Sequence, residues 1–162
     1  MSLVYVETSI PSLLTSRISG DIVVAAKQKQ TRDWWESEAP KHDLVTSGLV
    51  IAEISRGDPD AAKRRLEAIH GIKILKSNED VETLFDGYLA KLSLPMKARI
   101  DVLHIAFAVA FATDILLTWN CAHIANPETI RNLVRLNDSL GRETPLLLTP
   151  GQYFEHEAGR TP

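Results

Sequence analysis

The chain has 162 residues, of which 44% are hydrophobic and 24% are charged, and its formal net charge at pH 7 is −3. This composition fits one soluble globular domain, which we place at residues 1–154 with a frayed tail at 155–162. The single cysteine, Cys121, excludes an internal disulfide. We expect a cytoplasmic protein, because the first residues lack a signal peptide and the most apolar run, Val102–Ala112, is too short to cross a bilayer.

The first half of the chain alternates between strand and helix patterns. Runs of β-prone residues indicate strands, and apolar residues at helical spacing indicate helices. In chain order these patterns predict a strand at Leu3–Val6, a helix from about Asp21 to Ala39, a strand at Leu44–Ser47, a helix at Gly48–Ser55, a helix at Asp60–Gly71 and a strand at Ile72–Leu75. Ser47 is expected to cap the helix that follows it, because its hydroxyl can accept a hydrogen bond from a free N–H group there.

The second half continues the alternation. In chain order it predicts a helix at Asp80–Leu92 capped by Ser77, a helix at Met96–Ala112 with Pro95 at its start, a strand at Ile115–Thr118, a helix at Pro127–Leu140 capped by Asn126, and a strand at Leu146–Thr149. Strands that alternate with helices are typical of an α/β protein with a parallel sheet. We therefore predict a three-layer α/β/α sandwich around a central, mostly parallel sheet.

Four polar side chains follow strands or begin helices at matching places in this pattern. Glu7 comes directly after the first strand, and Glu53 lies in the helix after the second. Asp101 lies near the start of the most apolar helix, and Asn120 follows the fourth strand. In an open parallel sheet, ligands bind at the carboxyl ends of the strands. The sequence therefore predicts that these four side chains share one edge of the sheet.

Taken singly, each acid also has a structural explanation. Glu7 could face solvent at the start of a helix capped by Thr8 or Ser9, and Asp101 could be a cap or pair with Arg99 or Lys97. Taken together, three carboxylates would repel one another or take up protons unless a cation lay between them. Mg²⁺ or Mn²⁺ fits, because hard divalent ions prefer oxygen ligands and can activate water for attack on a phosphodiester.

With the four polar positions in this order along the sequence, the chain resembles the PIN-domain family, and within it the VapC-type toxin ribonucleases of bacterial toxin–antitoxin systems. The resemblance covers nearly the whole chain and rests on the segments YVETSIPSLL, SGLVIAEISRGD, LPMKARIDVLHIAFAVAFATDILLTWNCAHIAN and LLLTP. It implies a PIN-like fold and a metal-dependent endoribonuclease that cuts single-stranded RNA. It also implies a small antitoxin partner and a homodimer.

The resemblance assigns roles to particular residues. The family's quartet of acids around the metal corresponds to Glu7, Glu53, Asp101 and Asn120, of which the three acids would hold the ion. Ser9 corresponds to the family's hydroxyl after the first acid, where it could orient Glu7 or cap a helix, and Thr118 could play a similar supporting part.

Two positions depart from the family's commonest pattern. Glu7 replaces the usual aspartate, which keeps the charge but places the oxygens one methylene farther from the strand. Asn120 replaces an acid, and its amide oxygen can bind a metal or a metal-bound water but adds no negative charge. The alternative reading is therefore a catalytically weakened PIN-like module that binds RNA or a protein without cutting.

Several basic and histidine side chains near the acids have more than one interpretation. We expect Arg99 and Arg56 to follow the RNA backbone, although a solvated helix face is the simpler explanation of the basic residues. His123 could touch the substrate or simply end the loop after Asn120. His104 lies on an apolar helix, which is typical of a hydrogen-bonded core histidine.

Overall fold

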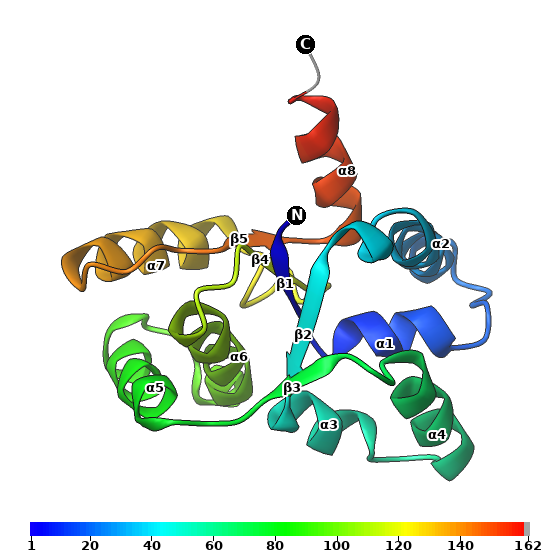
Figure 1. The fold of residues 1–162 in the computed structure, drawn as a ribbon, viewed down its shortest axis with the longest axis horizontal. Helices are drawn as coiled ribbons and strands as arrows, with labels where there is room; N and C mark the ends of the chain where they lie inside the picture. Colours follow the sequence, from blue (N-terminus) through cyan, green and yellow to red (C-terminus); the bar gives the residue numbers. More distant parts are fainter. Residues whose placement is uncertain (161–162) are drawn as a thin grey trace.

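The strands lie close to the positions that the sequence predicts. The structure, a computed structural model, describes residues 1–160 (Figure 1). The strands are β1 (Leu3–Val6), β2 (Asp43–Ser47), β3 (Lys73–Leu75), β4 (Ile115–Leu117) and β5 (Leu146–Leu148). The helices are α1 (Ser9–Thr15), α2 (Ile22–Ser37), α3 (Gly48–Ile54), α4 (Pro59–Ala68), α5 (Glu79–Lys91), α6 (Arg99–Ala110), α7 (Pro127–Ser139) and α8 (Pro150–Ala158), with 3-10 turns η1 (Ala39–Lys41) and η2 (Met96–Ala98). Each predicted strand is confirmed to within a residue at either end.

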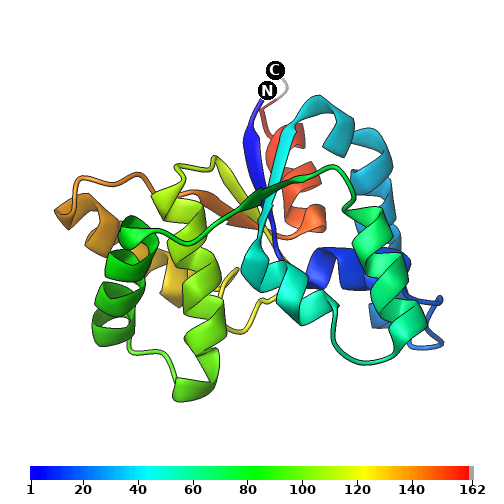
Figure 2. The same ribbon diagram turned by 60° about the horizontal axis from the view of Figure 1, so that its bottom comes forward.

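The strands form one five-stranded sheet in the order β3-β2-β1-β4-β5. Every pairing in it is parallel, and β1 occupies the centre, with Val4 aligned to Leu44 of β2 and to Ile115 of β4. The carboxyl ends of β1, β2 and β4 therefore meet at one edge (Figure 2). This edge is where the sequence analysis expects a site.

Helices cover both faces of the sheet. Successive side chains of a strand point to opposite faces, so Tyr5 of β1 packs in one cluster with α5, α6 and α7, while Val4 and Val6 pack in a second with residues of α1, α2 and α8. Figure 1 shows these two groups of helices on opposite sides of the strands. The predicted three-layer α/β/α sandwich is confirmed.

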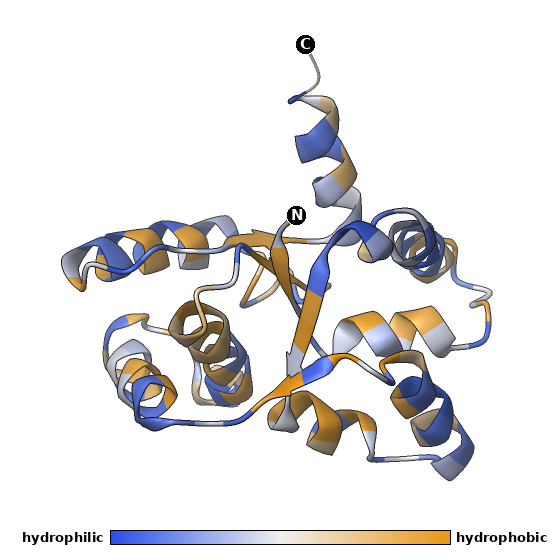
Figure 3. Cartoon of the chain, viewed as in Figure 1, coloured by the Kyte–Doolittle hydropathy of each residue, from blue (hydrophilic) through white to orange (hydrophobic). Residues whose placement is uncertain are grey.

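The most apolar helix, α6, is buried rather than exposed to a membrane. Its residues from Val102 to Val109 are buried apart from Leu103, and Figure 3 shows apolar residues concentrated in the strands and in this helix. Burial on most sides explains why its sequence lacks the polar face of a surface helix. Across the described part of the chain, no helix combines the length and apolarity needed to cross a membrane.

Two helix starts differ from the predicted ones. Asn78, not Ser77, caps α5, and its side chain accepts a hydrogen bond from the backbone N–H of Val81 at 2.9 Å. Pro95 has extended backbone angles and precedes the 3-10 turn η2, so α6 proper begins at Arg99. Both differences move a helix boundary by a few residues and leave the order of elements unchanged.

The chain end differs from the expected frayed tail. Residues 155–158 continue helix α8, while 161–162 lie outside the described residues. A capping box between Thr149 and Gln152 begins this helix, and Tyr153 is 4% exposed within the apolar cluster on that face of the sheet. The cap and the buried tyrosine explain why the segment is ordered.

Candidate metal and catalytic site

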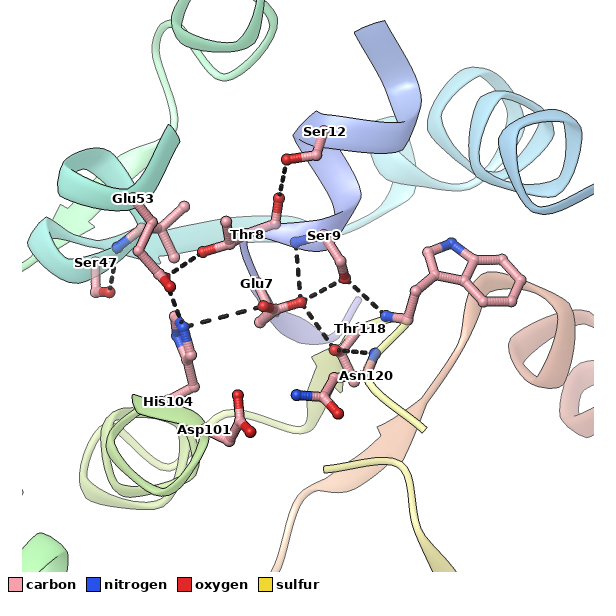
Figure 4. Close-up of polar contacts among 12 residues, drawn as sticks. Glu7, Thr8, Ser9, Ser12, Ser47, Glu53, Asp101, His104, Thr118 and Asn120 are labelled. Atoms are coloured by element: carbon pink, nitrogen blue, oxygen red, sulfur yellow. Dashed lines mark hydrogen bonds and ion pairs between the residues drawn. The ribbon is translucent and has the colours of Figure 1, made fainter. Parts of the chain in front are cut away.

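The four predicted site residues lie at the same edge of the sheet. Glu7 directly follows β1, Glu53 lies in α3 after β2, Asp101 lies in the first turn of α6, and Asn120 follows β4. Figure 4 shows their side chains turned toward a common space from four separate elements. The parallel sheet brings these elements together, because α6 runs back across the sheet and starts where the strands end.

Glu7 is a buried carboxylate that is held by the two predicted hydroxyls. Its side chain is 8% exposed, and its Oε2 atom accepts hydrogen bonds from the backbone N–H of Ser9 (3.0 Å), from the Ser9 hydroxyl and from the Thr118 hydroxyl (2.8 Å). Thr8, the N-cap residue of α1, accepts no capping hydrogen bond with its side chain, so the capping role considered for Thr8 and Ser9 is not realised. The hydroxyls instead orient Glu7, and its Oε1 accepts no hydrogen bond from residues 1–160.

Glu53 is held by a second pair of donors. Its Oε2 atom accepts hydrogen bonds from the Thr8 hydroxyl and from His104, whose Nε2 lies 2.9 Å away. Burial raises the pKa of Glu53, but the hydrogen bonds from His104 and Thr8, together with electrostatic interactions with His104 and Arg56, lower this pKa by more than burial raises it. The net pKa lies below its ordinary value, so Glu53 carries a negative charge at neutral pH.

Asp101 is paired with a histidine rather than with an arginine. Its Oδ2 lies 2.8 Å from Nδ1 of His123, and the backbone N–H of His123 donates to the amide oxygen of Asn120 at 3.0 Å. His123 therefore links Asp101 to Asn120 at the edge of the site. The Arg99 guanidinium lies over the ring of Phe85, 5.3 Å from its centroid, and not against Asp101.

The predicted RNA-binding arginines differ in their relation to the site. Arg56 is exposed and lies three residues after Glu53, just beyond the end of α3, and its charge lowers the pKa of Glu53. Arg99 is also exposed but packs on α5 through its contact with Phe85. Of the two, Arg56 is the better placed to meet a substrate bound at the carboxylates.

Two residues at the site make contacts that the sequence did not predict. The interpretation of His104 as a hydrogen-bonded core histidine is correct, since it is 1% exposed, but the same ring also donates to Glu53. Thr8 donates to Glu53 as well, although the sequence suggested only a helix cap. Their separation from Glu53 by 51 and 45 residues left no local signal of either contact.

The chemistry of the donors fits a hard divalent cation. In each of the three acids one carboxylate oxygen is hydrogen-bonded, and the other accepts no hydrogen bond within the described chain. Open carboxylate oxygens are the ligands that Mg²⁺ and Mn²⁺ prefer. Among residues 1–160, however, no group of three or more His, Cys, Asp or Glu side chains already forms a metal-binding cluster.

Acidification should destabilise the protein in part through Glu53. The pKa of this group is lowered on folding, so its contribution to stability is present above the unfolded value of 4.5 and is lost as pH falls through the folded value. Urea unfolding at neutral pH and at successive pH values below 4.5 would measure the loss. Glu53→Gln should lose less stability than wild type over this range, and an equal loss in both proteins would contradict the assignment.

Comparison with known proteins supports the fold. The sequence matches no protein-family model and no curated protein. Its structure does match a chain of the VapBC2 complex from Rickettsia felis, which was solved with a DNA fragment from the promoter of that complex. The two chains share 13% sequence identity with a TM-score of 0.60, and the match covers 91% of this chain and 98% of that chain. The Mycobacterium tuberculosis toxin VapC20, which cleaves the sarcin-ricin loop, matches with 17% identity, a TM-score of 0.57, and 74% and 91% coverage.

A third match is VapBC-1 from nontypeable Haemophilus influenzae, with 16% identity, a TM-score of 0.56, and coverage of 92% of this chain and 98% of that chain. Identities this low establish a common fold and leave activity to be argued from the site itself. The matches extend over most of each chain, so they concern the whole α/β/α sandwich and not one motif within it. The fold implied by the resemblance is therefore confirmed, and the chain has the PIN-like α/β fold of the VapC toxin structures.

Proposed function

We propose that the protein is a divalent-metal-dependent endoribonuclease that cleaves single-stranded RNA, and that it acts in the cytoplasm as the toxin of a toxin–antitoxin pair. The observation that carries this proposal is the convergence of Glu7, Glu53 and Asp101, each with one open oxygen, at the carboxyl edge of the sheet. The likeness in fold to VapC20, a toxin that cleaves the sarcin-ricin loop, adds support for an RNA substrate.

The proposed roles follow from the donors that each residue offers. Glu7, Glu53 and Asp101 would hold Mg²⁺ or Mn²⁺, and the amide of Asn120 would complete the site or orient a water. The bound ion would offset the carboxylate charges, polarise a phosphodiester and lower the pKa of a water molecule. Ser9 and Thr118 would keep Glu7 in place through their hydrogen bonds to its Oε2 atom.

The proposal includes two protein partners. A small antitoxin is suggested by the two structural matches that are VapBC complexes. A second copy of this chain is suggested by the family resemblance. Size-exclusion chromatography with light scattering would test the homodimer, and co-expression with the product of a neighbouring small gene would test the antitoxin.

A second candidate function keeps the fold but not the reaction. Asn120 removes one negative charge from the quartet, and no preformed cluster of three ligands exists within residues 1–160. Both observations favour a module that binds RNA or a protein without cutting it. Binding of RNA with no cleavage in the assay below would support this alternative.

Cleavage of a mixed-sequence single-stranded RNA should depend on added metal. We expect the purified protein to cut this RNA in Mn²⁺ and to lose activity by at least about a hundredfold in excess chelator, because the carboxylates alone cannot stabilise the charge that develops on the phosphate. The matched substrate is the same RNA annealed to its complement, which should be cut more slowly. Undiminished cleavage in chelator would contradict metal dependence.

A further inference from the structure

A buried chain of hydrogen bonds runs from the end of β2 to the site. Ser47, Tyr5 and His104 are at most 1% exposed. The Tyr5 hydroxyl lies 2.7 Å from Oγ of Ser47 and 2.9 Å from Nδ1 of His104, and Nε2 of His104 lies 2.9 Å from Oε2 of Glu53. Side chains from β2, β1 and α6 thus form a series of hydrogen bonds in which only the last, His104, contacts the Glu53 carboxylate.

The positions of the protons in this series of hydrogen bonds follow from its two end residues, Glu53 and Ser47. The Glu53 carboxylate only accepts hydrogen bonds, so Nε2 of His104 must carry a proton. In the neutral ring a proton on Nε2 leaves Nδ1 as an acceptor, and the Tyr5 hydroxyl is then the donor to His104.

The other end of the chain agrees with this direction. The oxygen of Ser47 already accepts a hydrogen bond from the backbone N–H of Val50, as the N-cap of α3. Its hydroxyl proton is therefore available to Tyr5. Ser47 then donates to Tyr5, Tyr5 to His104 and His104 to Glu53. Each of these buried polar side chains therefore has a hydrogen-bond partner.

His104 also lies between two of the acids. Its Nε2 atom is 2.9 Å from Glu53 and 4.0 Å from Oε1 of Glu7, and Figure 4 shows the ring between the two carboxylates. The ring is therefore hydrogen-bonded to Glu53 and lies at ion-pair distance from Glu7.

We propose that His104 and Tyr5 are positioning residues, in which Tyr5 fixes the orientation and tautomer of His104 and His104 in turn holds Glu53 relative to Glu7 for cation binding. The proposal rests on the proposed function, because it assigns these two residues to the same metal site. Partners of this kind that orient ligating side chains commonly change metal affinity when they are removed.

The first arm of the test needs no metal. Long-range ¹H–¹⁵N NMR of the metal-free wild-type protein at neutral pH should report His104 protonated on Nε2 and unprotonated on Nδ1. The signal is assigned by its absence from His104→Gln. A proton on Nδ1 of His104 would overturn the proposal, since Tyr5 could not then be the donor.

The second arm measures Mn²⁺ affinity by calorimetry. Tyr5→Phe and His104→Leu should each weaken Mn²⁺ binding by about tenfold, whereas His104→Gln, which keeps an N–H donor toward Glu53, should stay within about threefold of wild type. The matched control is Tyr88→Phe. Tyr88 is also 1% exposed and donates to Asn137 at 2.6 Å, outside the site.

The outcomes separate a positioning role from a purely structural one. Both tyrosine variants lose a buried hydrogen bond and should have lower melting temperatures, but only Tyr5→Phe should lose Mn²⁺ affinity. Unchanged affinity in Tyr5→Phe and His104→Leu would overturn the proposal. A wild-type protein that binds no Mn²⁺ would instead overturn the proposed function, and the NMR arm would still decide whether His104 holds Glu53.

Discussion

Asp101→Asn should lower the rate of RNA cleavage by at least about a hundredfold, because it removes one of the three charges that would hold the cation. The substitution keeps the size of the side chain, and an amide oxygen can still face His123, which is 2.8 Å from the acid in the wild type. The side chain of Asp101 is 18% exposed, and because asparagine fills the same space, folding should be little affected. Initial rates with Mn²⁺, together with a urea-unfolding curve, would separate activity from stability.

Asp114→Asn is the matched control for this variant. Asp114 lies at the opposite edge of the sheet, where its carboxylate accepts a hydrogen bond from the backbone N–H of Leu3 at 2.6 Å. An asparagine can accept the same bond, so this variant changes the net charge by the same amount without touching the site. Its cleavage rate should equal that of wild type. Equal losses in both variants would point to net charge rather than to the carboxylate cluster.

Glu7→Gln should abolish tight Mn²⁺ binding and reduce cleavage by about a hundredfold while the protein remains folded. The Oε2 atom of Glu7 accepts hydrogen bonds from Ser9 and Thr118. A glutamine would turn its carbonyl oxygen toward these donors, because its NH₂ group cannot accept from them. The NH₂ group would then replace the open oxygen that faces the site, and it cannot bind a cation.

Calorimetric titration with Mn²⁺ would measure this effect directly. Glu38→Gln provides the control, since Glu38 is also a partly buried glutamate, with a side chain 16% exposed and hydrogen-bonded to Lys41. Mn²⁺ affinity should be unchanged in Glu38→Gln. Wild-type affinity in Glu7→Gln would show that Glu7 has a structural role only, the simpler of the two interpretations that its sequence allows.

The secondary structure and the location of the site could be derived largely from local sequence patterns. β-prone runs place the strands to within a residue, and Ser47 caps α3 as its sequence indicates. Alternation of strands and helices implies a parallel sheet, and parallel strands bring their carboxyl ends to one edge. Together these rules predict that Glu7, Glu53, Asp101 and Asn120 lie near one another. Each rule depends on neighbours in the chain or on general topology, so a single sequence is sufficient.

Only the tertiary structure decided which atoms of the site are engaged. Thr118 donates to Glu7 across 111 positions of the chain, and His104 donates to Glu53 across 51. The partner of Asp101 is His123, 22 residues away, and not Arg99, two residues away. Sequence patterns indicate the face of a helix or strand on which a side chain lies. A hydrogen bond depends on the distance and direction between two atoms, and these are set by the packing of elements that are distant in the sequence. For the same reason the buried chain through Tyr5 and His104 became visible only in the folded protein.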